Sequence, residues 1–425
     1  MNRLSKAILI ILGAAGVAVV TVLVGLNLYV QSPGAQARIE EELSRALRVP
    51  LRITNITLTL WGDLRINGIT VPAEEGNFLE AASFGAHYRL LPLLRKQLLI
   101  SEMRMERPRI SWTQNAEGRW VLPTRSGEPA GPGKPVAGEK ASRPKKSDFE
   151  VRIEGFKIID GAAELLDRDG KQVASLTGAE LNYTTLTAER VEGTARIARL
   201  VYLDALHFEN LQTPFRYAGN QLELPEIRAQ LGGGEVEGRF TMHPKAPDSP
   251  LAARLELSDV DVERLTREAN WTQGQISGRL SGTAEFGGSS RRIERLKGTG
   301  AASVADAHFR HLEFFRTIGD ILKISELADL RVSDAHTAFR IENQKVYFEK
   351  LLLASPDVKL SANGVARFDK KLKLNARLAV SERTLKQLPQ WVHGNMTPGE
   401  DPGLRGIDFE ITGKTDKPKT DLLNR

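Results

Sequence analysis

The 425-residue chain contains no cysteine. This absence excludes a disulfide framework, a thiol nucleophile and a zinc site built from thiolates. It is compatible with an oxidising compartment, where a free thiol would be a liability. The composition is otherwise that of a folded protein, with 41% hydrophobic and 26% charged residues. The length is sufficient for two or three domains.

The sequence also lacks the short motifs that mark common catalytic sites. It has no Walker A loop, no Gly-x-Ser-x-Gly elbow, no His-Glu-x-x-His pair and no Gly-x-Gly-x-x-Gly turn after a strand. The glycine-rich stretch from Gly232 to Gly238 lacks a following Lys-Ser/Thr pair and predicts a turn. His308 and His311 have a spacing that could seat a metal on a helix, but no carboxylate pattern completes the site. We therefore predict a non-enzyme that holds no metal and no cofactor, because nothing assembles a nucleophile, a base and an orienting group.

A strong excess of one charge is absent as well. The chain has 59 basic and 53 acidic residues, for a net charge of +6. The densest basic run, Arg143 to Lys146, has no interleaved aromatic residues and lies in a Pro/Gly-rich stretch, which favours a solvated spacer. This pattern predicts no nucleic-acid partner.

One long segment, Ala7 to Val30, has no charge at all. Its roughly 24 residues would form a helix of about 36 Å, enough to cross a hydrocarbon core of about 30 Å. A cleavable export signal usually has an apolar region of only about 7–15 residues, so we predict an uncleaved, single-pass transmembrane anchor within residues 1–31. The anchor residues are Ala7, Ile11, Val17, Val24 and Tyr29, with Tyr29 at the interface.

The flanking charges predict the orientation of this anchor. Arg3 and Lys6 precede the span, whereas three glutamates follow Arg38 shortly after it. The positive-inside rule therefore places the N-terminus in the cytoplasm and the bulk of the chain outside. The alternative, cleavage at the signal-peptidase-like stretch Ala35 to Ala37, would discard the anchor.

A helix is expected directly after the anchor. Ser32 and Pro33 are typical of an N-cap and a first helical position. Apolar residues then recur on one helical face, at Ile39, Leu43, Ala46 and Leu47. We favour a helix that caps the following domain over one that lies on the bilayer surface.

After Pro50 the hydrophobic period changes to two, which indicates β-strands. The pattern predicts a β-bulge near Asn55, where the alternation shifts by one residue. It also predicts a hairpin turn at Asn67–Gly68. This first β region extends over residues 32–123.

Residues 124–148 contain many Pro, Gly and Lys residues and almost no large apolar side chain. We predict a flexible linker or long loop here, which would interrupt the sheet. From residue 149 to 425 the alternation resumes, with turns every 6–12 residues, as in a long antiparallel meander. Short helices are expected at "EFFRTIGDILKI", "DVERLTRE" and "SERTLKQL". The predicted fold class is mainly β: one transmembrane helix, a long antiparallel sheet and a few short helices.

Two stretches resemble each other, one from Asn220 to Phe240 and one from Asn343 to Phe368. Each has an Asn-Gln turn, two strands and a closing Phe. In the second copy, five apolar residues at alternating positions are candidates for the wall of a lipid-binding groove: Val346, Phe348, Val358, Leu360 and Phe368. They are equally well explained as ordinary core residues of a sheet that fills its own interior.

Several segments together resemble the AsmA family of envelope proteins. The most specific are "NLYVQSPGAQARIEEELSRAL" with "TLTLWGDLRINGITV" near the N-terminus, "IIDGAAELLDRDG" in the middle, and "FRIENQKVYFEKLLLASPDVKLSANGVARFD" through "ITGKTDKPKTDLL" near the C-terminus. The resemblance covers nearly the whole chain and none of these segments is a catalytic motif. It implies an anchor in the inner membrane of a Gram-negative bacterium, a periplasmic body, and a long, curled β-sheet with a hydrophobic groove.

The same resemblance implies a role in carrying phospholipids or in outer-membrane assembly. Membrane phospholipids would then be the ligands, with envelope proteins as further partners. The alternative is a non-enzymatic scaffold or regulator of outer-membrane protein assembly that binds no lipid and pairs through exposed strand edges. A sheet of roughly 20 strands would span about 95 Å at most, so a partner, a shuttle role and a local role at the inner membrane all stay open.

Overall fold

The computed structural model describes residues 32–422 apart from 48, 60–62, 74–75, 90–96, 119, 121–122, 124–149, 188–189, 271–274, 291, 370, 400 and 415–416. The predicted anchor, with Ala7, Ile11, Val17, Val24 and Tyr29, and the predicted linker lie outside the described residues. Among the helices that are described, none has the length and apolar character needed to cross a bilayer. The chain forms two compact units, Met1–Ala198 and Arg199–Arg425, and each is mainly β.

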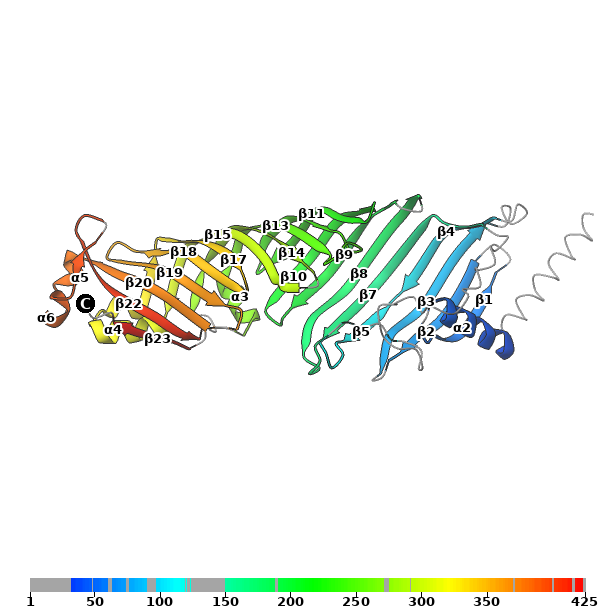
Figure 1. Cartoon of the computed structure of the whole chain (residues 1–425), viewed down its shortest axis with the longest axis horizontal. Helices are drawn as coiled ribbons and strands as arrows, with labels where there is room; N and C mark the ends of the chain where they lie inside the picture. The colour runs from blue at the N-terminus through cyan, green and yellow to red at the C-terminus, as the bar shows by residue number, and fades with distance from the viewer. Residues whose placement is uncertain are drawn as a thin grey trace, which may run out of the picture. The chain divides into compact units, whose positions relative to one another are not determined.

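In its described residues, the first unit has one helix and a mixed sheet (Figure 1). Its elements are α2 (Pro33–Leu47), β1 (Arg52–Leu58), β2 (Asp63–Pro72), β3 (Asn77–Arg89), β4 (Gln97–Glu106), β5 (Arg109–Thr113), β6 (Glu150–Ile153), β7 (Gly155–Leu166) and β8 (Gln172–Thr187). Strand β9 (Arg190–Tyr202) begins in this unit and ends in the second.

The second unit contains most of the described strands. Its strands are β10 (Leu206–Ala218), β11 (Gln221–Leu231), β12 (Gly234–Met242), β13 (Pro250–Asp261), β14 (Ile276–Ser289), β15 (Arg292–Arg310), β16 (Asp329–Val332), β17 (Asp334–Glu342), β18 (Lys345–Ala354), β19 (Val358–Arg367), β20 (Lys371–Ser381), β21 (Thr397–Pro398), β22 (Leu404–Lys414) and β23 (Lys417–Leu422). Its helices are α3 (Val262–Glu268), α4 (Glu313–Leu322), η2 (Ser325–Ala328), α5 (Glu382–Leu385) and α6 (Gln390–His393).

All three helices expected within the meander are confirmed, as α3, α4 and α5. The helix expected after Ser32 is also confirmed, as α2. The Ala35 N–H donates to the Ser32 Oγ at 3.4 Å, as an N-cap requires. Ile39 and Leu43 of α2 pack against buried residues of β1, β2 and β3. The interpretation of α2 as a cap on the domain is therefore confirmed.

The hairpin predicted at Asn67–Gly68 is wrong, because β2 runs without interruption through both residues. The bulge predicted at Asn55 is wrong as well, since the β1–β2 register continues unchanged from Arg52–Thr70 to Leu58–Leu64. Gly68 instead has a φ of +63°, and a Cβ there would overlap Thr54. The alternation of buried and exposed residues therefore shifts by one residue in β1 and β2 at the same place, near Thr54 and Gly68. This shift buries both Ile53 and Ile56 without an inserted residue.

The expectation of a wholly antiparallel sheet that the linker interrupts is also wrong. Strand β4 pairs in parallel with β6 and β7, and β5 pairs in parallel with β7. A parallel pair needs a long crossover connection, and the segment between β5 and β6 is long enough to provide it. The first unit therefore joins strands from both sides of the linker in one sheet.

The second unit is the antiparallel meander that the alternation predicts. Each described pairing from β10–β11 to β22–β23 is antiparallel. The colour progression in Figure 1 follows this order of neighbouring strands. The two similar stretches of sequence form equivalent hairpins, β11–β12 and β18–β19.

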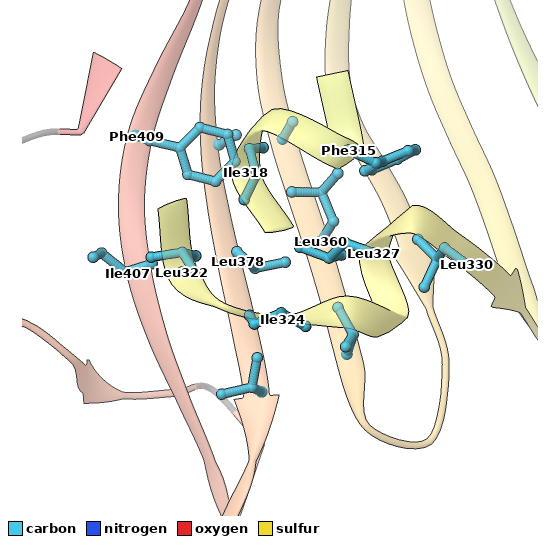
Figure 2. Packing of buried hydrophobic residues seen from close by; sticks show 14 of the residues in the cluster. Phe315, Ile318, Leu322, Ile324, Leu327, Leu330, Leu360, Leu378, Ile407 and Phe409 are labelled. Atoms are coloured by element: carbon cyan, nitrogen blue, oxygen red, sulfur yellow. The ribbon is translucent and has the colours of Figure 1, made fainter. Parts of the chain in front are cut away.

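The largest buried cluster lies where α4 and η2 cover strands of the second unit (Figure 2). Phe315, Ile318 and Leu322 form the apolar side of α4, and each is at most 5% exposed. They pack in one cluster with Leu378 of β20 and Phe409 of β22. Burying side chains of this size contributes about 1.5–3 kcal/mol each, so this region is a stable core.

Candidate functional site

The second unit carries an apolar surface made of residues that oppose one another on neighbouring strands. Directly opposed residues of an antiparallel pair point to the same side of the sheet. One row crosses β12 to β20 in the order Phe240, Ala253, Phe286, Gly298, Ile341, Val346, Ala366 and Leu372. At about 4.8 Å per strand spacing, this row is roughly 34 Å long.

A second apolar row lies beside the first, on the same side of the sheet. It runs through Leu255, Ala284, Gly300, Phe339, Phe348, Gly364 and Leu374. We call the surface formed by these two rows the apolar face. No residue of either row carries a charge or a side-chain hydrogen-bonding group, so the face can offer only hydrophobic contact.

Two glycines shape the floor of this face. A Cβ on Gly300 would overlap the ring of Phe339, and a Cβ on Gly298 would lie 2.8 Å from the Cβ of Phe286. The phenyl ring of Phe339 therefore lies close over the backbone of β15, where any larger residue would displace it. Glycine at these two positions therefore allows the side chains of Phe286 and Phe339 to approach β15 closely.

Helices cover the sheet of this unit only in part. One buried cluster includes Val260 and packs Leu265 of α3 against Leu257 and Leu280, and the large cluster lies under α4 and η2. Phe240 and Phe286 belong to neither cluster and are half-buried. This central part of the apolar face is therefore the part that an apolar ligand could cover.

The structure separates the five residues predicted for a groove wall. Val346, Phe348, Val358 and Leu360 share the apolar side of β18 and β19, since a register shift after Phe348 keeps the two strands in phase. Val358 and Leu360 are only 3% and 4% exposed and belong to the core under α4. Val346 and Phe348 are half-buried, and Phe348 packs against the edge of that core.

Phe368 is not part of the apolar face, because it follows the end of β19 and is 44% exposed. Sequence reasoning missed the more central residues Phe240, Phe286 and Phe339. Their strands show the same alternation of apolar and polar residues, so the signal was present. What was missing was the register that brings these three residues into adjacent rows.

The first unit has an apolar row of the same kind. It crosses β1, β2, β3, β4, β7 and β8 in the order Ile56, Ile66, Phe84, Met105, Ile158 and Leu181. Ile56 and Ile66 are buried in the cluster to which α2 contributes, whereas Ile158 and Leu181 are half-buried. The parallel pairing of β4 with β7 carries this row across the connection between β5 and β6.

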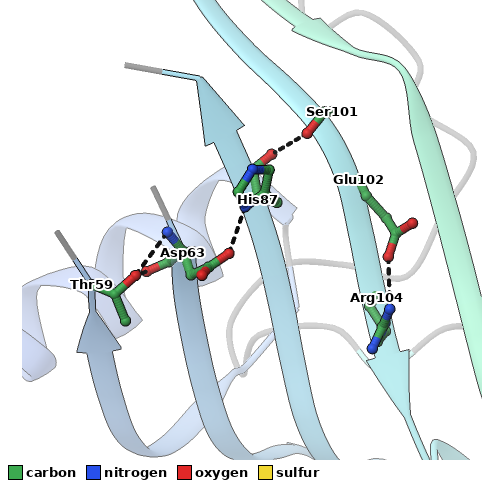
Figure 3. Close-up of polar contacts among 6 residues, drawn as sticks. All are labelled: Thr59, Asp63, His87, Ser101, Glu102 and Arg104. Atoms are coloured by element: carbon green, nitrogen blue, oxygen red, sulfur yellow. Dashed lines mark hydrogen bonds and ion pairs between the residues drawn. The ribbon is translucent and has the colours of Figure 1, made fainter. Parts of the chain in front are cut away.

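Asp63, His87 and Ser101 of the first unit make contacts between neighbouring strands (Figure 3). The Nδ1 of His87 lies 2.6 Å from the Oδ1 of Asp63. Ser101 donates from Oγ to the backbone carbonyl of His87 at 3.1 Å, not to its imidazole ring. These three residues are therefore not arranged as a nucleophile, base and orienting acid.

Glu102 forms an ion pair between the parallel strands β4 and β7. Its carboxylate lies 2.6 Å from Lys157 of β7 and 3.0 Å from Arg104. The hydrogen bond from Lys157 lowers the pKa of Glu102, and Arg104 adds to this effect, although partial burial opposes it. The pair thus ties β4 to β7.

The histidines that sequence spacing singled out do not form a metal site. His308 pairs with Asp329 of β16 through its Nε2. Within the described part of the chain, no group of three or more His, Cys, Asp and Glu side chains is arranged to hold a metal ion.

No protein-family model, no curated protein and no solved structure matches this chain.

Proposed function

We propose that this protein handles phospholipid at the bacterial inner membrane by binding acyl chains on the apolar face of its sheet. In this proposal residues 1–31 anchor the chain in the inner membrane, and the bulk of the chain lies in the periplasm. The protein would contribute to lipid transport or to outer-membrane assembly without performing covalent chemistry. The resemblance of its sequence segments to the AsmA family supports this assignment.

The observation that carries the proposal is the half-buried central part of the apolar face. Exposing large aromatic side chains such as Phe240 and Phe286 to water is unfavourable, and a contiguous apolar surface of this kind marks an interaction site. An acyl chain gains about 0.8 kcal/mol for each buried CH₂, or about 12 kcal/mol gross for 16 carbons, before ordering costs. The row of roughly 34 Å exceeds the thickness of one leaflet, about 15 Å.

Photo-crosslinking of the full chain in cells tests this proposal. We would place p-benzoylphenylalanine at Phe286, where the new side chain keeps an aromatic ring on the apolar face. The matched control is the same amino acid at Thr283, an exposed residue of β14 on the opposite side of the sheet. We expect a phospholipid adduct at position 286 and none at 283, detected by mass spectrometry of the purified protein.

Two other outcomes of the crosslinking experiment would count against lipid binding on the apolar face. Equal lipid labelling at both positions would indicate nonspecific contact with the bilayer and would contradict the proposal. A protein adduct at position 286 without lipid would favour the scaffold alternative.

A further inference from the structure

A depression of about 530 Å³ in the second unit is lined by fifteen residues, ten of which lie on the side of the sheet opposite the apolar face. Five strands, β12, β13, β14, β15 and β17, each contribute three consecutive residues to it. The first and third residue of each triplet point away from the apolar face, because the middle one belongs to the row of Phe240, Phe286 and Ile341. We call this feature the polar-face depression.

Both small and charged residues line the depression. Ala252 and Gly287 oppose each other on β13 and β14, and neither carries a side chain that could fill the space. The charged lining residues are Arg239, Arg254, Glu285, Lys297, Arg340 and Glu342. Four cations and two carboxylates leave a formal charge of +2.

Three of the four cations are engaged by the two carboxylates. Arg254 pairs with Glu285 across β13 and β14. Glu342 lies 2.8 Å from Lys297 and 2.7 Å from Arg340. Arg239 lines the depression and has no ion-pair partner among the described residues, so one guanidinium group there is left uncompensated.

The unpaired Arg239 also lies directly opposite a second arginine. Arg239 and Arg254 are direct partners in the β12–β13 register, and opposed Cβ atoms of such pairs are about 4.5–5.5 Å apart. Like charges placed directly opposite each other are destabilising. A dianionic or monoanionic oxygen group between them would remove this repulsion and accept paired N–H donors from each planar guanidinium group.

We propose that the polar-face depression binds a phosphate ester, with Arg239 and Arg254 holding the phosphate group and the organic part lying over Ala252 and Gly287. The site lies on the side of the sheet opposite the apolar face. It therefore does not depend on the proposed binding of acyl chains. The phosphate could belong to a lipid headgroup or to a small soluble ester, and these two sources share the same recognition chemistry.

Phosphorus NMR titration of the full chain in non-ionic detergent tests the site. The probes are glycerol 3-phosphate, a soluble ester, and dihexanoyl phosphatidylglycerol, a short-chain lipid. We expect the wild-type chain to bind at least one probe, and Arg239→Gln to weaken that binding roughly tenfold or more, because a charge-assisted hydrogen bond is lost. The control Arg279→Gln removes the same charge from β14 outside the depression and should leave binding unchanged.

A second variant tests the floor of the depression. Ala252→Glu places a carboxylate beside the two arginines and should abolish binding of the same probe, while circular dichroism verifies that the variant is folded. Binding of the lipid alone identifies a headgroup as the source, and binding of glycerol 3-phosphate alone identifies a soluble ester. Absence of binding by the wild-type chain, or equal weakening by Arg239→Gln and Arg279→Gln, overturns the proposal. Lipid adducts at position 286 are expected to persist in Arg239→Gln, which separates this site from the apolar face.

Discussion

Leu360 and Phe348 lie on the same side of the sheet, yet they have different surroundings. Leu360 is 4% exposed and packs in the cluster under α4, whereas Phe348 is half-buried at its margin. A charge at Leu360 would therefore disturb the core before it could report on a ligand. Phe348 and the central Phe240 and Phe286 are better positions from which to probe the apolar face.

We predict that Leu360→Ala lowers the free energy of unfolding by about 2–5 kcal/mol, because it leaves a cavity in a close-packed core. The measurement is the shift of the urea midpoint of the full chain. The control Phe368→Ala removes a side chain that is 44% exposed and should change stability by less than about 0.5 kcal/mol. Equal effects at the two positions would show that α4 does not cover Leu360 in solution.

The ion pair between Glu102 and Lys157 predicts a pH effect. Because the folded state lowers the pKa of Glu102 below its ordinary value of 4.5, the pair stabilises the fold above pH 4.5. This contribution is lost as the pH falls through the lower, folded value. We expect Glu102→Gln to be less stable than the wild type at pH 6, and this difference to shrink as the pH is lowered from 4.5 to 3.

Urea midpoints measured along this pH series provide the test. The control is Glu164→Gln, which removes an exposed carboxylate from β7. If the Glu102→Gln and wild-type curves remain parallel below pH 4.5, the ion pair does not form in solution.

Among the elements, α2 has a second role besides covering apolar residues. The Ile53 N–H donates to the Oε1 of Glu40 at 2.6 Å, and the Leu51 N–H donates to the Oγ of Ser44 at 3.0 Å. Side chains of the helix thus occupy backbone donors along the start of β1. Unpaired donors on a strand edge are a template for pairing with another chain, so α2 shields this edge.

We predict that the double variant Glu40→Ala with Ser44→Ala speeds amide hydrogen exchange at Leu51 and Ile53 and promotes self-association. The exchange rates and sedimentation velocity of the full chain measure the two effects. The control Glu41→Ala removes an exposed carboxylate of the same helix, which pairs only with Arg45 among the described residues. Unchanged exchange in the double variant would mean that the helix does not protect β1.

The sequence predicted the elements better than their connections. Amphipathic spacing and cap residues sufficed for α2 and α4, because both signals are local. The pair Asn67–Gly68 was misleading, since the positive φ of Gly68 serves a phase change within β2 rather than a turn. The parallel pairing of β4 with β7 depends on partners about 50 residues apart, which no local pattern encodes.

The same limit applies to the candidate site. Alternation identified Val346, Phe348, Val358 and Leu360 as one face of two strands. It could not show that α4 covers the last two, because that contact joins the helix to strands that follow it in the sequence. Nor could it reveal the opposition of Arg239 and Arg254, which depends on the register of β12 and β13.

At the scale of the whole molecule, hydrophobic burial is divided among separate clusters. The first unit has one around Ile53, Ile56 and Ile66 under α2. The second unit has the large cluster under α4 and a smaller one under α3. Where each element contacts only its neighbours, cooperativity between distant parts is lost, so the two units need not unfold together.

We therefore predict that a core mutation destabilises only its own unit. Leu378→Ala removes a side chain that is 1% exposed in the large cluster, and it should speed hydrogen exchange in β18–β22 while β1–β3 retain their protection. Ile66→Ala should give the converse result, since this residue is buried in the cluster of the first unit. Hydrogen exchange with mass spectrometry on the full chain reads both regions in one experiment. A uniform increase across both units in either variant would show that they unfold as a single cooperative body, and the separate clusters would then have to be coupled through β9, the strand that enters both units.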